Sequence, residues 1–166
     1  MAGLGCTGPE PIESGPVPAR GFEIALEQLV DGVPVPLDDG GTARMYLGFQ
    51  GFLMLTLFAR GPDAPDIADA AMSAEIEGAA PVSVNQPRVG FTGSGDDRVS
   101  GELLFFLSSS YSSWYAGREA EIAVKLAAPD AVALAVAHVT LVEGEDCHDE
   151  SGCGEPDDSG DGEDSG

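Results

Sequence analysis

Apolar and polar side chains alternate along much of the chain between residues 21 and 142. The alternation is clearest in Glu119–Ala127, where Ala120, Ile122, Val124 and Leu126 share one face. Residues that alternate in this way point to opposite sides of a β-strand, so the pattern predicts half-buried strands. Apolar residues at helical spacing are missing over any long window. The pattern therefore predicts an all-β protein.

The most apolar stretch, Met45–Phe58, is interrupted once, at Gly48–Gly51. We interpret it as two strands joined by a tight connection, Thr42–Leu47 and Phe52–Ala59. The second strand is apolar on both faces, which predicts a central strand that is covered on both sides or lies within a sandwich. A charge introduced at Leu55, in its middle, would be buried without a partner.

Turn residues separate the other predicted strands. Asp31-Gly32 is a hairpin signal, and the prolines of Val33–Leu37 confine that segment to an edge or a loop, because proline donates no hydrogen bond to a ladder. About eight short strands at regular spacing predict a β-sandwich of about 7–9 strands. The remaining strands are expected at Phe22–Glu27, Ala71–Glu77, Pro81–Val84, Pro87–Phe91, Val99–Leu107 and Val132–Val142.

The two ends of the chain differ in composition from this body. Residues 1–20 hold four prolines and no periodic pattern, which is typical of a flexible tether. Residues 143–166 hold eleven acidic residues and no basic ones, which predicts an acidic disordered tail. The predicted β-sandwich domain therefore spans residues 21–142.

The chain carries 29 acidic and seven basic residues, a formal net charge of −22. This charge argues against nucleic-acid binding, which needs clustered Lys and Arg to neutralise phosphates. Anionic membrane surfaces are disfavoured for the same reason. The high charge keeps the protein soluble and leaves basic partners and cations as candidates for binding.

Leu4-Gly5-Cys6, followed by a Pro/Gly-rich stretch, is similar to the end of a bacterial lipoprotein signal, in which a small residue precedes a lipidated cysteine. Gly3 stands where that motif prefers Leu. One hypothesis is that Cys6 carries a lipid anchor and Met1 is an internal or trimmed start. The alternative is a free cysteine. The hypothesis predicts an extracytoplasmic protein, either an outer-membrane or periplasmic lipoprotein or a secreted one, that meets the membrane only through the anchor.

Cys147 and Cys153 form the densest polar cluster together with His148. As a pair they predict a small disulfide-closed loop in an oxidising compartment. The alternatives are idle thiols or a metal site, which would be one ligand short of a structural zinc site.

The acidic tail also contains carboxylates at close spacing, as calcium loops do, but without the calcium-loop ligand register. A solvated tail is the preferred interpretation, and weak binding of divalent cations is the alternative. The carboxylates concerned are Asp157, Asp158, Asp161 and Glu163.

No Gly-x-Ser-x-Gly motif or P-loop is present, His138 lies in the last predicted strand, and Asp96-Asp97 fit a turn. We therefore expect no enzyme activity and no cofactor. Tyr111, Trp114 and Tyr115 border a Ser-rich loop, a composition used in adaptable binding surfaces. The alternative is that Trp114 and one tyrosine plug the end of the sandwich.

The arrangement Leu37-x10-Gly48-Phe49-Gln50-Gly51-Phe52, followed by a strand, resembles uncharacterised secreted or lipid-anchored β-sandwich proteins of Gram-negative bacteria. Residues 115–119, then strand, turn and final strand, resemble their C-terminal hairpin, which is similar to that of immunoglobulin-like domains. The resemblance covers about Gly21–Val142. It implies a fold and a compartment but no activity. Members often carry a His where this chain has Met54, so no role of that His carries over.

The sequence thus predicts a non-enzymatic protein of the cell envelope with a structural or binding role and an unidentified protein or envelope partner. The alternative is a secreted cation- or ligand-binding module that uses the acidic tail.

Overall fold

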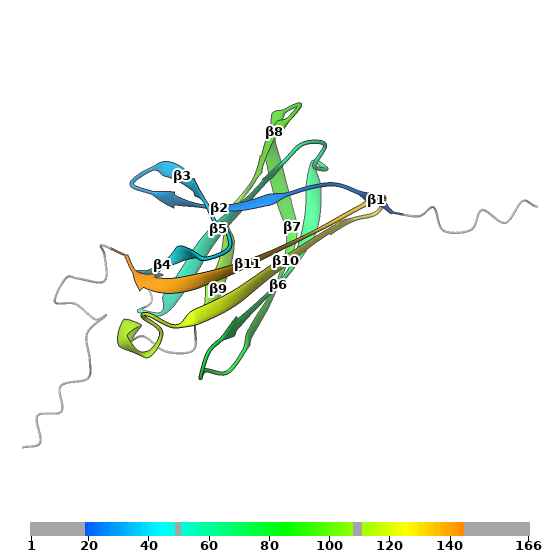
Figure 1. The fold of residues 1–166 in the computed structure, drawn as a ribbon. Coiled ribbons are helices and arrows are strands. Elements are labelled where there is room, and N and C mark those ends of the chain that lie inside the picture. The colour runs from blue at the N-terminus through cyan, green and yellow to red at the C-terminus, as the bar shows by residue number, and fades with distance from the viewer. Residues whose placement is uncertain (1–18, 49–50, 108–110, 145–166) are drawn as a thin grey trace, which may run out of the picture.

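The computed structural model describes residues 19–48, 51–107 and 111–144. Apart from one 3-10 turn, η1 (Ser112–Trp114), all its elements are strands (Figure 1). The prediction of an all-β protein is confirmed. The strands are β1 (Arg20–Gly21), β2 (Ala25–Val30), β3 (Val33–Pro36), β4 (Gly41–Leu47), β5 (Leu53–Gly61), β6 (Ile67–Ile76), β7 (Val82–Ser94), β8 (Asp97–Ser100), β9 (Leu103–Phe106), β10 (Glu119–Ala128) and β11 (Ala131–Glu143).

Seven of these described strands close into a barrel, with neighbours in the order β4, β11, β10, β6, β7, β8, β5 and back to β4. The predicted sandwich has two separate sheets, whereas here one sheet closes on itself. The alternation of apolar and polar residues does not distinguish a sandwich from a barrel, because each of them buries one face of every strand. Closure follows from β11, which pairs with β10 along one edge and with β4 along the end of the other.

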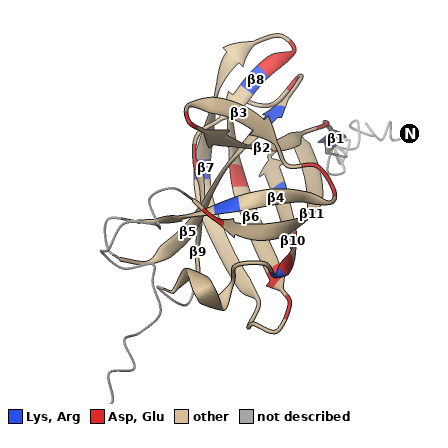
Figure 2. Ribbon diagram, turned by 60° about the vertical axis from the view of Figure 1, so that its left-hand side comes forward, with Lys and Arg blue, Asp and Glu red and all other residues tan. Residues whose placement is uncertain are grey.

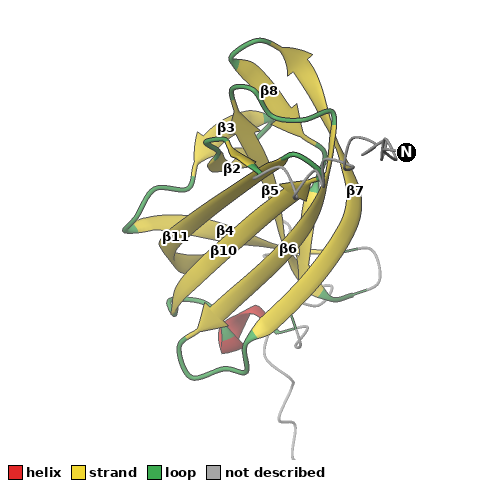
Figure 3. Cartoon of the chain, turned by 90° about the vertical axis from the view of Figure 1, so that its right-hand side faces the viewer, coloured by secondary structure: helices red, strands yellow, loops and turns green. Residues whose placement is uncertain are grey.

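Inward-pointing side chains fill the barrel. Along β5, Leu53, Leu55, Leu57 and Ala59 are completely buried, and they alternate with partly exposed residues. The long strands β6, β10 and β11 lie side by side in Figure 3 and supply the other half of the interior. The predicted inward face of the penultimate strand is confirmed, since Ala120, Ile122, Val124 and Leu126 are all buried.

The β2–β3 hairpin confirms two predictions from turn chemistry. Asp31 and Gly32 have φ angles of 53° and 77°, as the two central residues of a type I′ turn require. The strand after this turn pairs with β2 alone and is an edge strand. Its two prolines leave few donors for another chain to pair with.

Among the strands whose predicted bounds differ from the structure, two cases change where a strand is continuous. The short strands expected on either side of Asn85-Gln86 are one strand, β7, with a bulge where Arg88 takes a φ of 55° and donates its N–H to the Asp69 carboxylate. A bulge keeps a strand continuous past a proline. Conversely, the single strand expected over Val99–Leu107 is broken at Gly101 into β8 and β9.

Two glutamine side chains bridge places where strands diverge. The buried Gln28 amide accepts a 2.7 Å hydrogen bond from Arg44 N–H and donates to Arg44 C=O, and so joins β2 to β4. The Gln86 amide donates to Glu102 C=O at 2.7 Å and accepts from Leu104 N–H, and so joins β7 to β9. Each amide makes hydrogen bonds to the neighbouring strand where backbone-to-backbone hydrogen bonds end, and so keeps the diverging strands in place.

The described chain enters and leaves the barrel at opposite ends (Figure 1). The first strand, β1, pairs with the start of β11, and β4 pairs with its end. The 13 residues of β11 span about 40 Å at about 3.3 Å per residue. None of the described elements is a helix that could cross a membrane.

Candidate functional site

The outward faces of β4, β5 and β9 carry a set of apolar and aromatic side chains that we call the aromatic wall. Strand register places Tyr46 beside Met54 and Met54 beside Phe106, so that these three form one row across the sheet. Two of the large rings are about half exposed, Phe52 at 49% and Phe106 at 50%. The wall consists of Tyr46, Phe52, Met54, Phe58, Leu104 and Phe106.

The sequence forms this wall because β5 and β9 are apolar on both sides. Leu55 of β5 and Phe105 of β9 point into the barrel and are completely buried, while their neighbours point outward. The both-sided pattern of β5 predicts a second covering layer, but no described element packs over the outer face of β9 at Phe106. Figure 2 shows β9 without charged residues, in contrast to most other strands and turns.

Two shallow hollows lie next to each other on this wall. The larger has a volume of about 440 Å³ and lies over β9 and the β4–β5 connection, and the smaller has about 270 Å³ and lies over β5 towards β2. Met54 and Glu102 line both hollows, so we treat them as one continuous feature, the aromatic groove. Its walls are otherwise Leu47, Gly48, Phe52, Leu104 and Phe106 on one side and Leu29, Tyr46, Thr56 and Phe58 on the other.

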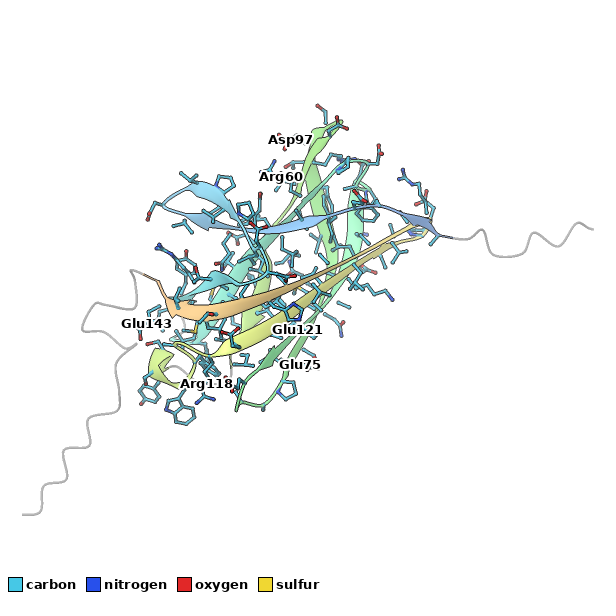
Figure 4. All side chains as sticks on the ribbon, viewed as in Figure 1. Arg60, Glu75, Asp97, Arg118, Glu121 and Glu143 are labelled. Atoms are coloured by element: carbon cyan, nitrogen blue, oxygen red, sulfur yellow. The ribbon has the colours of Figure 1, made fainter. Side chains whose placement is uncertain are left out.

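The outer faces of β6, β10 and β11 form a contrasting wall, which we call the acidic wall after its carboxylates, although β11 also exposes Leu134 and Val136 there. Glu75 lies beside Glu121 and Glu121 beside His138 in the strand register, and Figure 4 shows Glu75 and Glu121 on this side of the barrel. A more open depression of about 520 Å³ lies between these groups, Glu77 and Glu119. A cluster of carboxylates is not by itself a ligand site, and we interpret this wall as a solvated surface.

His138 links three elements of the acidic wall. Its backbone N–H donates to Asp39 at 2.9 Å, its Nδ1 lies 3.2 Å from the same carboxylate, and its Nε2 lies 3.0 Å from Glu121. Hydrogen bonds to Asp39, and then to Glu121, raise the pKa of His138. The backbone hydrogen bond from His138 is the main reason why the pKa of Asp39 is lowered. The imidazole thus ties the turn before β4 to β10 and β11.

The predicted binding loop is divided between surface and interior. Tyr115 is only 3% exposed and lies in the core, whereas Trp114 is 57% exposed. Tyr111 lies against the indole, with ring centroids 6.3 Å apart. Tyr115 is therefore buried, as the interpretation of a closed end expects of one tyrosine. Trp114 lies on the surface, so the part of that interpretation that concerns Trp114 is wrong. A binding role for Tyr111 and Trp114 stays a prediction.

The cysteines and the acidic tail lie outside the described residues. The predicted lipid anchor at Cys6, the predicted Cys147–Cys153 disulfide and the cation-binding alternative at Asp157, Asp158, Asp161 and Glu163 therefore stay predictions. Within residues 19–48, 51–107 and 111–144, no group of three or more His, Cys, Asp or Glu side chains is arranged to hold a metal ion.

Comparisons with known proteins find no matching family model, no matching curated protein and no matching solved structure. The resemblance to secreted or lipid-anchored β-sandwich proteins stays a prediction.

Proposed function

We propose that the protein is a non-enzymatic binding protein of the cell envelope that holds an apolar segment of a partner protein in the aromatic groove. The observation that carries this proposal is the outward apolar face of β5 and β9. The closed interior is lined by a different, completely buried set of side chains, so these outward side chains are not part of that interior. Exposed apolar patches with a polar surround are typical of interaction surfaces.

The shape of the groove favours a polypeptide over a small molecule. Small-molecule sites enclose most of the ligand surface, whereas this groove is two open hollows set side by side across three strands. Two hollows suit two side chains of one segment. The flexible thioether of Met54, which lines both, adapts to different apolar shapes.

The predicted anchor supports a cell-envelope location for this activity. The tether precedes β1, which lies at the start of β11, while Tyr46 on β4 lies near the other end of β11. A lipid at Cys6 would therefore hold the barrel by the end of β11 that lies opposite to Tyr46, about 40 Å away along that strand. Mass spectrometry of the protein from native membranes tests this part, and an unmodified Cys6 contradicts it. The immunoglobulin-like relationship belongs to the same proposal and rests on the sequence resemblance alone.

Selection of peptides from a random displayed library tests the groove. We expect the full chain to enrich peptides with at least two apolar or aromatic residues. The double variant Phe52→Ser/Phe106→Ser should bind these peptides at least about tenfold more weakly, because truncating central aromatic anchors costs more than 1 kcal/mol each.

A matched control comes from the acidic wall. Leu134 and Val136 on β11 are exposed by 65% and 45% but line neither hollow. The double variant Leu134→Ser/Val136→Ser should therefore bind the selected peptides like the unaltered protein. Equal loss in both double variants, or no enrichment of apolar peptides at all, would overturn the proposed function.

A further inference from the structure

Among the described residues, Glu102 is the one charged residue that lines the aromatic groove, and it lines both hollows. Neither hollow is lined by a Lys or Arg of the described chain. Resting on the proposed function, we propose that the groove selects a partner segment with a basic residue flanked by apolar ones, in the order apolar–x–basic–x–apolar. The apolar side chains occupy the hollows, and the cation meets Glu102.

The position of Glu102 is set by the fold. It lies in the two-residue break between β8 and β9, and its backbone C=O accepts the 2.7 Å hydrogen bond from Gln86. The same glutamine amide accepts from Leu104 N–H. Glu102 and the start of β9 are therefore held against β7, which fixes where the Glu102 backbone lies relative to the groove.

The described part of the chain does not neutralise this carboxylate. Its Arg–carboxylate ion pairs join Arg60 to Glu27 and Asp97, and Arg98 to Asp66, and Figure 4 shows Arg60 and Asp97 together near the β8 end of the barrel. No ion pair among the described residues includes Glu102. A cation from a partner would add the missing opposite charge.

The neighbouring rings favour the same partner. Phe52 and Phe106 are half exposed on the wall of the larger hollow, and the face of an aromatic ring attracts Lys and Arg. A segment with an acidic residue would meet Glu102 and a chain of net charge −22. For the same reason a second copy of this chain is a poor occupant, because both copies carry the same large negative charge.

The period of the proposed segment follows from strand geometry. In an extended chain, successive side chains point to opposite sides, so residues i, i+2 and i+4 share one face. A basic residue placed two positions from each apolar residue therefore points into the groove together with them. Adjacent placement would direct the cation away from Glu102.

Three acetylated and amidated peptides that differ at the central position test the proposal: Phe-Ser-Lys-Ser-Phe, Phe-Ser-Gln-Ser-Phe and Phe-Ser-Glu-Ser-Phe. Binding to the full chain is measured by isothermal titration calorimetry at low ionic strength. We expect the Lys peptide to bind about fivefold more tightly than the Gln peptide and the Glu peptide to bind most weakly. In Glu102→Lys the order of the three affinities should reverse. In Glu102→Gln the differences in affinity among the three peptides should become smaller.

Glu75→Lys is the matched control, because it changes the net charge by the same amount on the acidic wall, which is away from both hollows. It should keep the order of the unaltered protein. An unchanged order in Glu102→Lys, or the same reversal in Glu75→Lys, would show that total charge sets the preference and would overturn the inference.

The inference and the proposed function fail in different ways. If all three peptides bind equally and binding is lost in Phe52→Ser/Phe106→Ser, the groove binds apolar segments but Glu102 selects nothing. If no peptide binds, or if sedimentation shows that a second copy of the chain covers the groove, both proposals are contradicted.

Discussion

The aromatic wall and the acidic wall have matching inner faces and different outer faces. Leu55 on β5 and Ile122 on β10 are both completely buried, so the two halves contribute to one core in the same way. Outside, β10 presents Glu119, Glu121 and Lys125, whereas β5 and β9 present Met54, Phe58, Leu104 and Phe106. Strand β10 shows that a strand of this barrel needs only one apolar face. The second apolar face on the aromatic wall therefore calls for an explanation other than folding.

The largest expected effect is on stability, and it distinguishes substitutions on the inner face of β5 from those on its outer face. Leu55→Asp places an unpaired carboxylate in the closed interior, and the lost burial of about 2 kcal/mol adds to the cost of desolvating the charge. We expect no cooperative unfolding transition for this variant in urea, followed by circular dichroism.

Thr56→Asp is the control for that substitution, because Thr56 is the next residue and points outward into the groove. It should fold and lose about 1 kcal/mol or less, the range of β-strand preferences. A soluble Leu55→Asp variant with a normal transition would contradict the placement of β5.

The neighbouring phenylalanines of β9 extend the same comparison to a second strand. Phe105→Ala should lower the free energy of unfolding by about 3–5 kcal/mol, because its ring is completely buried and a cavity would remain. Phe106→Ala should cost less than about 1 kcal/mol, since half of that ring is already in water. Equal losses in chemical denaturation would mean that the outer ring is part of the core.

Next to the aromatic wall, the Gln28 side chain bridges β2 and β4. Gln28→Leu removes the bonds to both Arg44 backbone groups, and the buried groups left without partners should cost about 1–3 kcal/mol. Gln86→Leu should cost less, because its hydrogen bond to Glu102 C=O is exposed and the one from Leu104 N–H is long, at 3.3 Å. The order of the two urea midpoints is the test, and the reverse order would contradict the role of Gln28.

The smallest effect concerns the histidine of the acidic wall. Because the folded pKa of His138 is raised above 6.5, its stabilising contribution is complete below that pH and is lost as the pH rises through the folded pKa. The lowered pKa of Asp39 gives a contribution that is lost at the acidic end, as the pH falls through that folded value. Titration of His138 by NMR should give a midpoint above 6.5 that drops in Asp39→Asn, and no change in that variant would contradict the link.

Local chemistry predicted several elements from the sequence. The Asp31-Gly32 turn, the proline-bearing edge strand and the buried face of β10 depend on neighbouring residues only. Closure of the barrel depends on which distant strands meet, here Gly41–Met45 with Val139–Glu143. Alternation carries no information about that pairing.

The sequence predicted only part of the groove. The pattern of Phe52–Ala59 shows apolar residues on both faces, but it does not tell whether the chain itself or a partner covers the second face. The break at Gly101-Glu102, which brings Glu102 to the hollows, has one sequence signal, the glycine between two strand-forming stretches. Glu102 would otherwise be placed within a strand.

The central claim is that the outer face of β5 and β9 is a binding surface, and its methionines offer a direct test. Of the four methionines, Met45 and Met72 are buried in the core, Met1 lies outside the described residues, and Met54 lines both hollows. With methionine methyl groups labelled, addition of the Phe-Ser-Lys-Ser-Phe peptide should shift the Met54 resonance and leave those of Met45 and Met72 in place. A peptide that binds without moving the Met54 resonance would contradict the account.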